Sequence, residues 1–149
     1  MEIYLIILFL NKYIITNMLK NQEIVCKNLD ELKLFAKQFL PVIKKHQFLL
    51  MNGDLGAGKT ALVKELGLLI GIKENINSPS FNYMKNYEGL VHIDLYSYKG
   101  DLEEFEDFFE DNIVAIEWAN LSNYNFKNFI KMNVTLKDDL HVYKIVEVK

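Results

Sequence analysis

Hydrophobic positions in the first half of the chain predict a strand, a turn and a helix in direct succession. Residues 47–51 form an almost continuous apolar run of strand length, which is typical of a parallel strand buried on both faces. After a glycine-rich stretch, apolar residues recur at helical spacing from Leu62 to Ile70, with Lys64 and Glu65 on the other side. Gly71 then marks the expected end of this helix.

The segment before this unit predicts one edge strand and one helix. Residues 22–26 have the length of a short strand, and apolar side chains follow at helical spacing from Leu32 to Leu40. Asn28 and Glu31 resemble a capping box at the start of this helix. Pro41 is expected to end or kink it.

The second half of the chain predicts mainly strands. Extended backbone is expected around Pro79, and Glu88-Gly89 reads as a tight turn between strands at 81–87 and 90–96. Asp101 is expected to cap a short acidic helix that buries Leu102, Phe105 and Phe109. A buried strand at 112–118 follows, and alternation at 130–136 and 141–148 predicts a terminal hairpin.

The order of these elements predicts an α/β fold. We expect a three-layer, P-loop NTPase-like domain whose mixed sheet has parallel strands around the glycine-rich loop and antiparallel additions. Residues 18–149 would form this single domain. Residues 1–17 are an apolar extension of uncertain status, too short to span a bilayer and without the basic start and cleavage site of a secretory signal. We expect an upstream extension and not a membrane anchor, and a cytoplasmic protein.

Composition narrows the range of partners. The net charge of −3 argues against a broad electrostatic footprint for nucleic acid, so RNA contact is expected only through a partner protein. All seventeen basic residues are lysine, so any arginine at a catalytic site must come from another protein. One cysteine and three scattered histidines provide neither an intramolecular disulfide nor zinc-site spacing.

The glycine-rich stretch carries the strongest chemical signal. Residues 53–60 read Gly-Asp-Leu-Gly-Ala-Gly-Lys-Thr and fit the phosphate-binding pattern G-x-x-x-x-G-K-[ST], with the strand before and the helix after that this pattern needs. Lys59 is placed to reach the β- and γ-phosphates, and the hydroxyl of Thr60 is placed to coordinate Mg²⁺.

Two carboxylates at predicted strand ends complete the candidate site. Asp94 closes an apolar run in the manner of a Walker B aspartate, and Glu117 closes the run Ile113-Val114-Ala115-Ile116. Ligands of open α/β sheets bind beyond the carboxyl ends of parallel strands, so Glu117 is expected near the phosphates. Both residues are therefore candidates for metal binding and for orienting water.

Four motifs in one order resemble the TsaE (YjeE) family of bacterial ATPases. They are the phosphate loop 53–60, Ser-Pro-Ser-Phe at 78–81, His-Ile-Asp-Leu-Tyr at 92–96 and Ile-Glu-Trp at 116–118, and the likeness runs from about Gln22 to the C-terminus. The family is required to form N6-threonylcarbamoyladenosine (t6A) at position 37 of transfer RNAs that read codons beginning with A. The resemblance implies ATP and Mg²⁺ as cofactors and TsaD- and TsaB-like proteins as partners.

The resemblance also implies roles for individual residues. Glu117, Asp94 and Lys59 would be catalytic, and Thr60, Glu117 and Asp94 would serve the metal. The ATP phosphates would be held by Asp54, Leu55, Gly56, Ala57, Gly58, Lys59, Thr60 and Ala61, with Ser80 in a switch-like segment at 78–80 that senses the γ-phosphate.

Three positions depart from the family pattern. Ala61 stands where the family usually has a second threonine, and Ser80 retains a hydroxyl in place of threonine. Ser97 stands where arginine is usual, and Lys99 is near enough in sequence to substitute for it.

The expected function is an Mg²⁺-dependent ATPase that is weak alone, because an arginine finger can contribute about 10³ to 10⁵ in turnover. A P-loop kinase of a small metabolite is the main alternative, although the absence of arginine makes a substrate clamp harder to build. A GTP switch lacks its guanine-reading Asn-Lys-x-Asp segment. A nucleotide-binding scaffold without catalysis is the remaining alternative.

Overall fold

The fold is described from a computed structural model that covers residues 19–79 and 81–149. The predicted extension at 1–17, Met18 and the candidate residue Ser80 lie outside the described residues. The domain boundary at residue 18 therefore stays a prediction. None of the helices in the described ranges is both long and apolar enough to cross a membrane.

Residues 19–79 and 81–149 are organised by one seven-stranded sheet, in the order β1-β7-β6-β2-β5-β4-β3. Its strands are β1 (Glu23–Cys26), β2 (Phe48–Asn52), β3 (Met84–Tyr87), β4 (Leu90–Asp94), β5 (Ile113–Glu117), β6 (Phe129–Lys137) and β7 (Leu140–Val148). The four central strands, β6, β2, β5 and β4, run parallel, and β1, β7 and β3 pair antiparallel at the two sides. This arrangement confirms the predicted mixed sheet.

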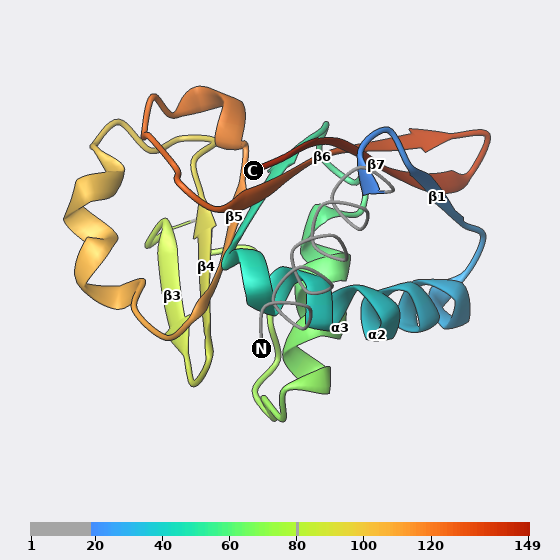
Figure 1. Cartoon of the computed structure of the whole chain (residues 1–149), viewed down its shortest axis with the longest axis horizontal. Coiled ribbons are helices and arrows are strands. Elements are labelled where there is room, and N and C mark those ends of the chain that lie inside the picture. Colours follow the sequence, from blue (N-terminus) through green and yellow to red (C-terminus); the bar gives the residue numbers. More distant parts are fainter. Residues whose placement is uncertain (1–18, 80) are drawn as a thin grey trace, which may run out of the picture.

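In the described part of the chain, two α-helices cover one face of the sheet. Helix α2 (Leu29–His46) and helix α3 (Lys59–Leu69) lie together on that face (Figure 1). Their buried apolar side chains share a core with the strands. The other face packs against the 3-10 helices η1 (Leu102–Phe108) and η2 (Ala119–Leu121) and the segment that contains Phe126. The sheet is thus the middle of three layers, and its central strands are buried on both faces.

Helix α2 corrects one part of the prediction for Pro41, namely that the helix ends there. The side chain of Asn28 accepts a hydrogen bond from the backbone N–H of Glu31, as the capping box predicts. The helix does not end near Pro41 but continues to His46. Pro41 and Lys37, whose carbonyl it leaves free, are both exposed, so water can satisfy that carbonyl.

Two predicted elements of the second half differ in the structure. The strand expected at 81–87 begins only at Met84, because the N–H of Tyr83 bonds to the carbonyl of Pro79 and closes a turn. Asp101 makes no side-chain cap, and the segment after it is a 3-10 helix that buries Leu102 but leaves Phe105 half-buried. Local turn bonds override the spacing of apolar residues in both places. The terminal hairpin β6–β7 is confirmed.

Candidate functional site

The ends of three central strands bring the predicted site residues to one edge of the sheet. Strand β2 runs directly into the glycine-rich loop, β4 ends at Asp94 and β5 ends at Glu117. Glu117 lies opposite Met51 of β2 on one side and opposite Asp94 of β4 on the other. The parallel register therefore places both carboxylates beside the loop, at the edge where ligands of such sheets bind.

Gly53 shows why the loop needs glycine where it leaves the strand. Its φ of 155° is a conformation that side chains disfavour. A Cβ atom at this position would collide with the carbonyl oxygen of Val134 on the neighbouring strand β6. The loop can pass close to β6 only because residue 53 has no side chain.

Lys59 is buried at the centre of the site, with 4% of its surface exposed. Its ammonium group donates to the backbone carbonyls of Gly53 and Asp54, the second at 2.9 Å, and lies 4.7 Å from the centre of the Trp118 ring. Burial lowers the pKa of Lys59, and the carboxylates of Glu117, Asp94 and Asp54 oppose this shift. The ammonium group of Lys59 is thus held by carbonyls of the glycine-rich loop, which precedes Lys59 in the chain.

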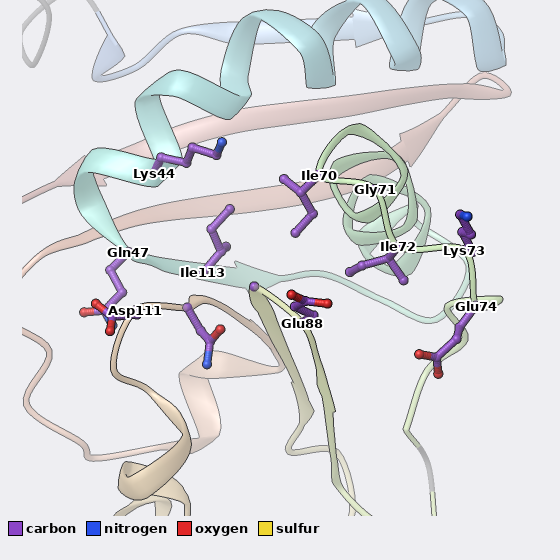
Figure 2. A pocket seen from close by; sticks show the side chains of 12 residues that line it. Lys44, Gln47, Ile70, Gly71, Ile72, Lys73, Glu74, Glu88, Asp111 and Ile113 are labelled. Atoms are coloured by element: carbon purple, nitrogen blue, oxygen red, sulfur yellow. The ribbon is translucent and has the colours of Figure 1, made fainter.

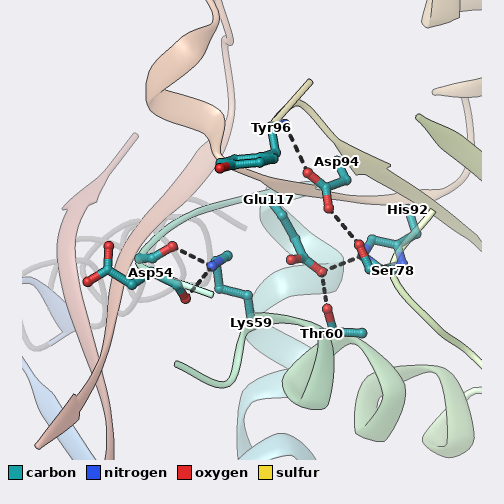
Figure 3. A network of polar contacts seen from close by, with 9 residues as sticks. Asp54, Lys59, Thr60, Ser78, His92, Asp94, Tyr96 and Glu117 are labelled. Atoms are coloured by element: carbon teal, nitrogen blue, oxygen red, sulfur yellow. Dashed lines mark hydrogen bonds and ion pairs between the residues drawn. The ribbon is translucent and has the colours of Figure 1, made fainter. Parts of the chain in front are cut away.

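Thr60, Glu117 and His92 form a compact chain of hydrogen bonds (Figure 3). One carboxylate oxygen of Glu117, Oε1, accepts from Thr60 Oγ1 at 2.6 Å and from His92 Nε2 at 2.8 Å. Glu117 is 4% exposed and His92 is fully buried. A buried carboxylate is stable only where donors compensate for lost hydration, and these two side chains provide them.

His92 is the site residue that sequence reasoning missed. It lies two residues before Asp94 on β4, so alternation along the strand points both side chains to the same face of the sheet. Its only sequence signal is its place in the motif at 92–96. The structure gives it a direct contact with Glu117.

Asp94 is engaged by different partners. Its Oδ2 accepts from the hydroxyl of Ser78 at 2.5 Å, and its Oδ1 accepts from the backbone N–H of Tyr96 at 2.9 Å. The structure therefore ties β4 to the segment that contains Ser78, while Thr60 contacts Glu117 and not Asp94. Asp94 lies beside Glu117 but supports the site through Ser78.

The donor set of the site suits a hard divalent cation with few protein ligands. Among residues 19–79 and 81–149, no cluster of three or more His, Cys, Asp or Glu side chains could hold a metal by itself. Mg²⁺ usually keeps several waters and takes one or two carboxylates together with phosphate oxygens. The hydroxyl of Thr60 and the carboxylate of Glu117, 2.6 Å apart, fit that requirement.

A separate cavity of about 810 Å³ lies at the opposite edge of the sheet (Figure 2). Residues at the beginnings of strands and the ends of helices line it, among them Gln47 before β2, Gly71 after α3 and Ile113 at the start of β5. None of the predicted site residues contributes to it. This cavity is therefore separate from the polar network at the glycine-rich loop.

Comparison with known proteins decides the family. The family model described as "Threonylcarbamoyl adenosine biosynthesis protein TsaE" matches residues 26–144. The chain belongs to the TsaE family. This membership confirms the resemblance drawn from the four sequence motifs.

Individual relatives agree with the TsaE assignment. The tRNA threonylcarbamoyladenosine biosynthesis protein TsaE of Rickettsia bellii is 33% identical over 129 residues, covering 80% of this chain and 90% of the relative. The protein of the same name from Bacillus subtilis is 35% identical over 101 residues, covering 63% of this chain and 64% of the relative. The crystal structure of Bacillus subtilis YdiB superimposes with a TM-score of 0.67 at 26% identity and covers 87% of each chain.

Proposed function

We propose that this TsaE family member binds and hydrolyses ATP with Mg²⁺ and is required to form t6A at position 37 of transfer RNAs that read codons beginning with A. The observation that supports this proposal is the convergence of Lys59, Thr60 and Glu117 beside the glycine-rich loop, with Thr60 and Glu117 2.6 Å apart. The names of the relatives from Rickettsia bellii and Bacillus subtilis support the connection to t6A.

Each residue of the network has a distinct task in this proposal. Lys59 exchanges its bonds to the carbonyls of Gly53 and Asp54 for bonds to phosphate oxygens. Thr60 and Glu117 hold Mg²⁺, which supplies neutralisation of phosphate charge when it is bound. Glu117 also orients the attacking water, and His92 keeps the Glu117 carboxylate in place through Oε1.

Asp94 connects the strand end to the segment that precedes Ser80. Its hydrogen bond to Ser78 links β4 to the switch-like segment at 78–80, so a change at the γ-phosphate can reach that segment through one side-chain contact. Asp94 therefore supports the metal site indirectly. The role of Ser80 stays a prediction, since Ser80 lies outside the described residues.

A partner protein completes the site in this proposal. The chain has no arginine, Ser97 replaces the usual family arginine, and Lys99 is exposed after β4. Three apolar side chains in site segments are largely exposed: Leu55 at 76%, Phe81 at 92% and Tyr96 at 56%. These exposed side chains are available for contact with a partner protein. We assign this contact to TsaD- and TsaB-like proteins, with transfer RNA bound only through them.

The test is an ATPase assay of the purified chain with Mg²⁺, with and without TsaD- and TsaB-like partners from the same source. We expect slow turnover alone and a stimulation of about 10³ or more if a partner supplies an arginine. Lys59→Ala should abolish the stimulated activity. Lys64→Ala, which removes an exposed lysine from the same helix, should leave it unchanged.

Four outcomes would contradict the proposal. Fast turnover without partners would remove the partner requirement, and full activity of Lys59→Ala would remove the role of the loop. A burst of ADP that depends on one small metabolite would favour the kinase alternative instead. Glu117→Gln should bind ATP but lose stimulated hydrolysis, whereas a scaffold would function normally with this substitution.

A further inference from the structure

Two side chains of strand β7 contact the outer side of the phosphate loop. His141 Nδ1 lies 2.6 Å from the carbonyl oxygen of Ala57, and the hydroxyl of Tyr143 donates to the carbonyl oxygen of Gly58 at 2.8 Å. A carbonyl oxygen can only accept, so His141 must carry its proton on Nδ1. His141 and Tyr143 are two residues apart on the strand and therefore point to the same face.

These contacts hold the carbonyl oxygens of two peptide groups of the loop, and the Gly58 carbonyl also accepts from the backbone N–H of Leu62 in α3 at 3.3 Å. The C=O and N–H of a trans peptide point in opposite directions within one plane. Holding the Ala57 carbonyl therefore aims the N–H of Gly58 the opposite way, and holding the Gly58 carbonyl does the same for the N–H of Lys59. Phosphate loops bind their ligand through such backbone N–H groups.

The two donors are themselves rigidly held. Strand β7 is paired on both sides, with β1 and β6. Tyr143 is fully buried, and its ring packs against Phe35 of α2 with centroids 5.6 Å apart. Burial also raises the pKa of the Tyr143 phenol, which keeps its hydroxyl a donor.

Gly58 shows how closely β7 approaches the loop. A Cβ atom at this position would lie 2.6 Å from the Tyr143 hydroxyl and 3.0 Å from His141 Nδ1. Because Gly58 has no side chain, β7 can lie this close to the loop. For the same reason residue 58 can adopt its φ of 121°.

We propose that His141 and Tyr143 form a carbonyl clamp, a pair of positioning residues that aims the amides of Gly58 and Lys59 at the phosphates. This inference rests on the proposed nucleotide binding and adds residues that lie outside all four sequence motifs. It gives β7, which pairs antiparallel with β6, a role at a site that is built on parallel strands. Neither side chain is a catalytic residue, since both act through the loop backbone.

The sequence allows each clamped peptide to be observed singly by NMR. Ala57-Gly58 is the only Ala-Gly pair in the chain, and Gly58-Lys59 is the only Gly-Lys pair. Labelling with carbonyl-¹³C alanine and ¹⁵N glycine therefore gives one cross-peak for the first peptide, and carbonyl-¹³C glycine with ¹⁵N lysine gives one for the second. Loss of a clamp hydrogen bond should shift the corresponding carbonyl resonance upfield.

Three variants test the clamp by calorimetric titration with Mg-ADP. Tyr143→Phe removes one hydroxyl, and His141→Leu removes the other donor; each should weaken Mg-ADP binding about 3- to 10-fold, the usual value of one hydrogen bond. His141→Asn places an amide N–H near the position of Nδ1 and should restore most of the affinity. Tyr87→Phe is the matched control, because the buried Tyr87 hydroxyl has no hydrogen-bond partner in the described part of the chain.

The outcomes separate the clamp from the proposed function. If the wild-type chain does not bind Mg-ADP, the proposed function fails. If it binds and both Tyr143→Phe and His141→Leu keep wild-type affinity and carbonyl shifts, the clamp is overturned. An equal loss in His141→Leu and His141→Asn, or a loss in Tyr87→Phe, would also overturn it, because general destabilisation would then explain the effect. If Tyr143→Phe does not fold, the comparison of His141→Leu with His141→Asn still tests the clamp.

Discussion

The hydrogen bond between His92 and Glu117 gives the sharpest stability prediction. His92 Nε2 and Thr60 Oγ1 are both donors to Oε1 of Glu117, and the His92 and Glu117 side chains are buried. Replacing His92 with leucine leaves the buried carboxylate with one side-chain donor, Thr60, among the described residues. A hydrogen bond to a charged group contributes about 1.5–3 kcal/mol.

A single substitution understates this contribution. Nδ1 of His92 is buried and has no partner among the described residues, which costs about 1–3 kcal/mol. His92→Leu relieves that cost while it removes the bond to Glu117, so the two changes partly cancel. A double-mutant cycle with Glu117→Met isolates the pair, and we expect a coupling of about 1.5–3 kcal/mol.

Urea unfolding followed by Trp118, the only tryptophan of the chain, measures the four proteins of this cycle. The pair Lys131 and Glu147, also 2.8 Å apart but with side chains 36% and 46% exposed, is the more solvated control and should couple by about 0–1 kcal/mol. A coupling between His92 and Glu117 below about 0.5 kcal/mol would refute the reasoning, because additive substitutions share no interaction.

Three further predictions concern stability. Gly53→Ala should lower the free energy of unfolding by about 3 kcal/mol or more, since a Cβ at this position would collide with backbone atoms. A Cβ at Gly56 has free space, so Gly56→Ala should cost only about 1–2 kcal/mol of backbone strain. Equal losses of the two variants in urea unfolding would contradict this. Leu66→Ala should cost about 3–5 kcal/mol because Leu66 is fully buried, and Leu68→Ala, 51% exposed, should cost under 1 kcal/mol in the same assay. Because burial raises the folded-state pKa of Tyr143, its contribution to stability is complete below about pH 10 and declines above it; Tyr143→Phe should flatten this alkaline decline, and an unchanged decline would show that other groups cause it.

Local pattern predicted those elements whose neighbours in sequence are also their structural partners. The loop between β2 and α3 and the hairpin β6–β7 follow from apolar spacing and short turns, and both are as expected. The ends of β4 and β5 followed from carboxylates that close apolar runs. The site residues on these ends are therefore identifiable from the order of residues along the chain.

The errors arose where a few local hydrogen bonds decided the backbone. Pro41 was expected to end or kink its helix; the helix does not end there but continues to His46, and the exposed position of Pro41 lets water replace the lost bond. Residues 81–83 form a turn because Tyr83 bonds to Pro79, although their composition suits a strand. The spacing of apolar residues carries no information about such hydrogen bonds, so it does not predict them.

The sequence by itself determined the phosphate loop, the family and the residue types of the site, because these depend on contiguous motifs. Only the tertiary structure decided that His92 supports Glu117, that Ser78 holds Asp94 and that β7 lies against the loop. These contacts join residues 16 to 85 positions apart, and they depend on strand order and register. Periodicity along the chain specifies which face a side chain takes, but only the packed sheet specifies what lies opposite it.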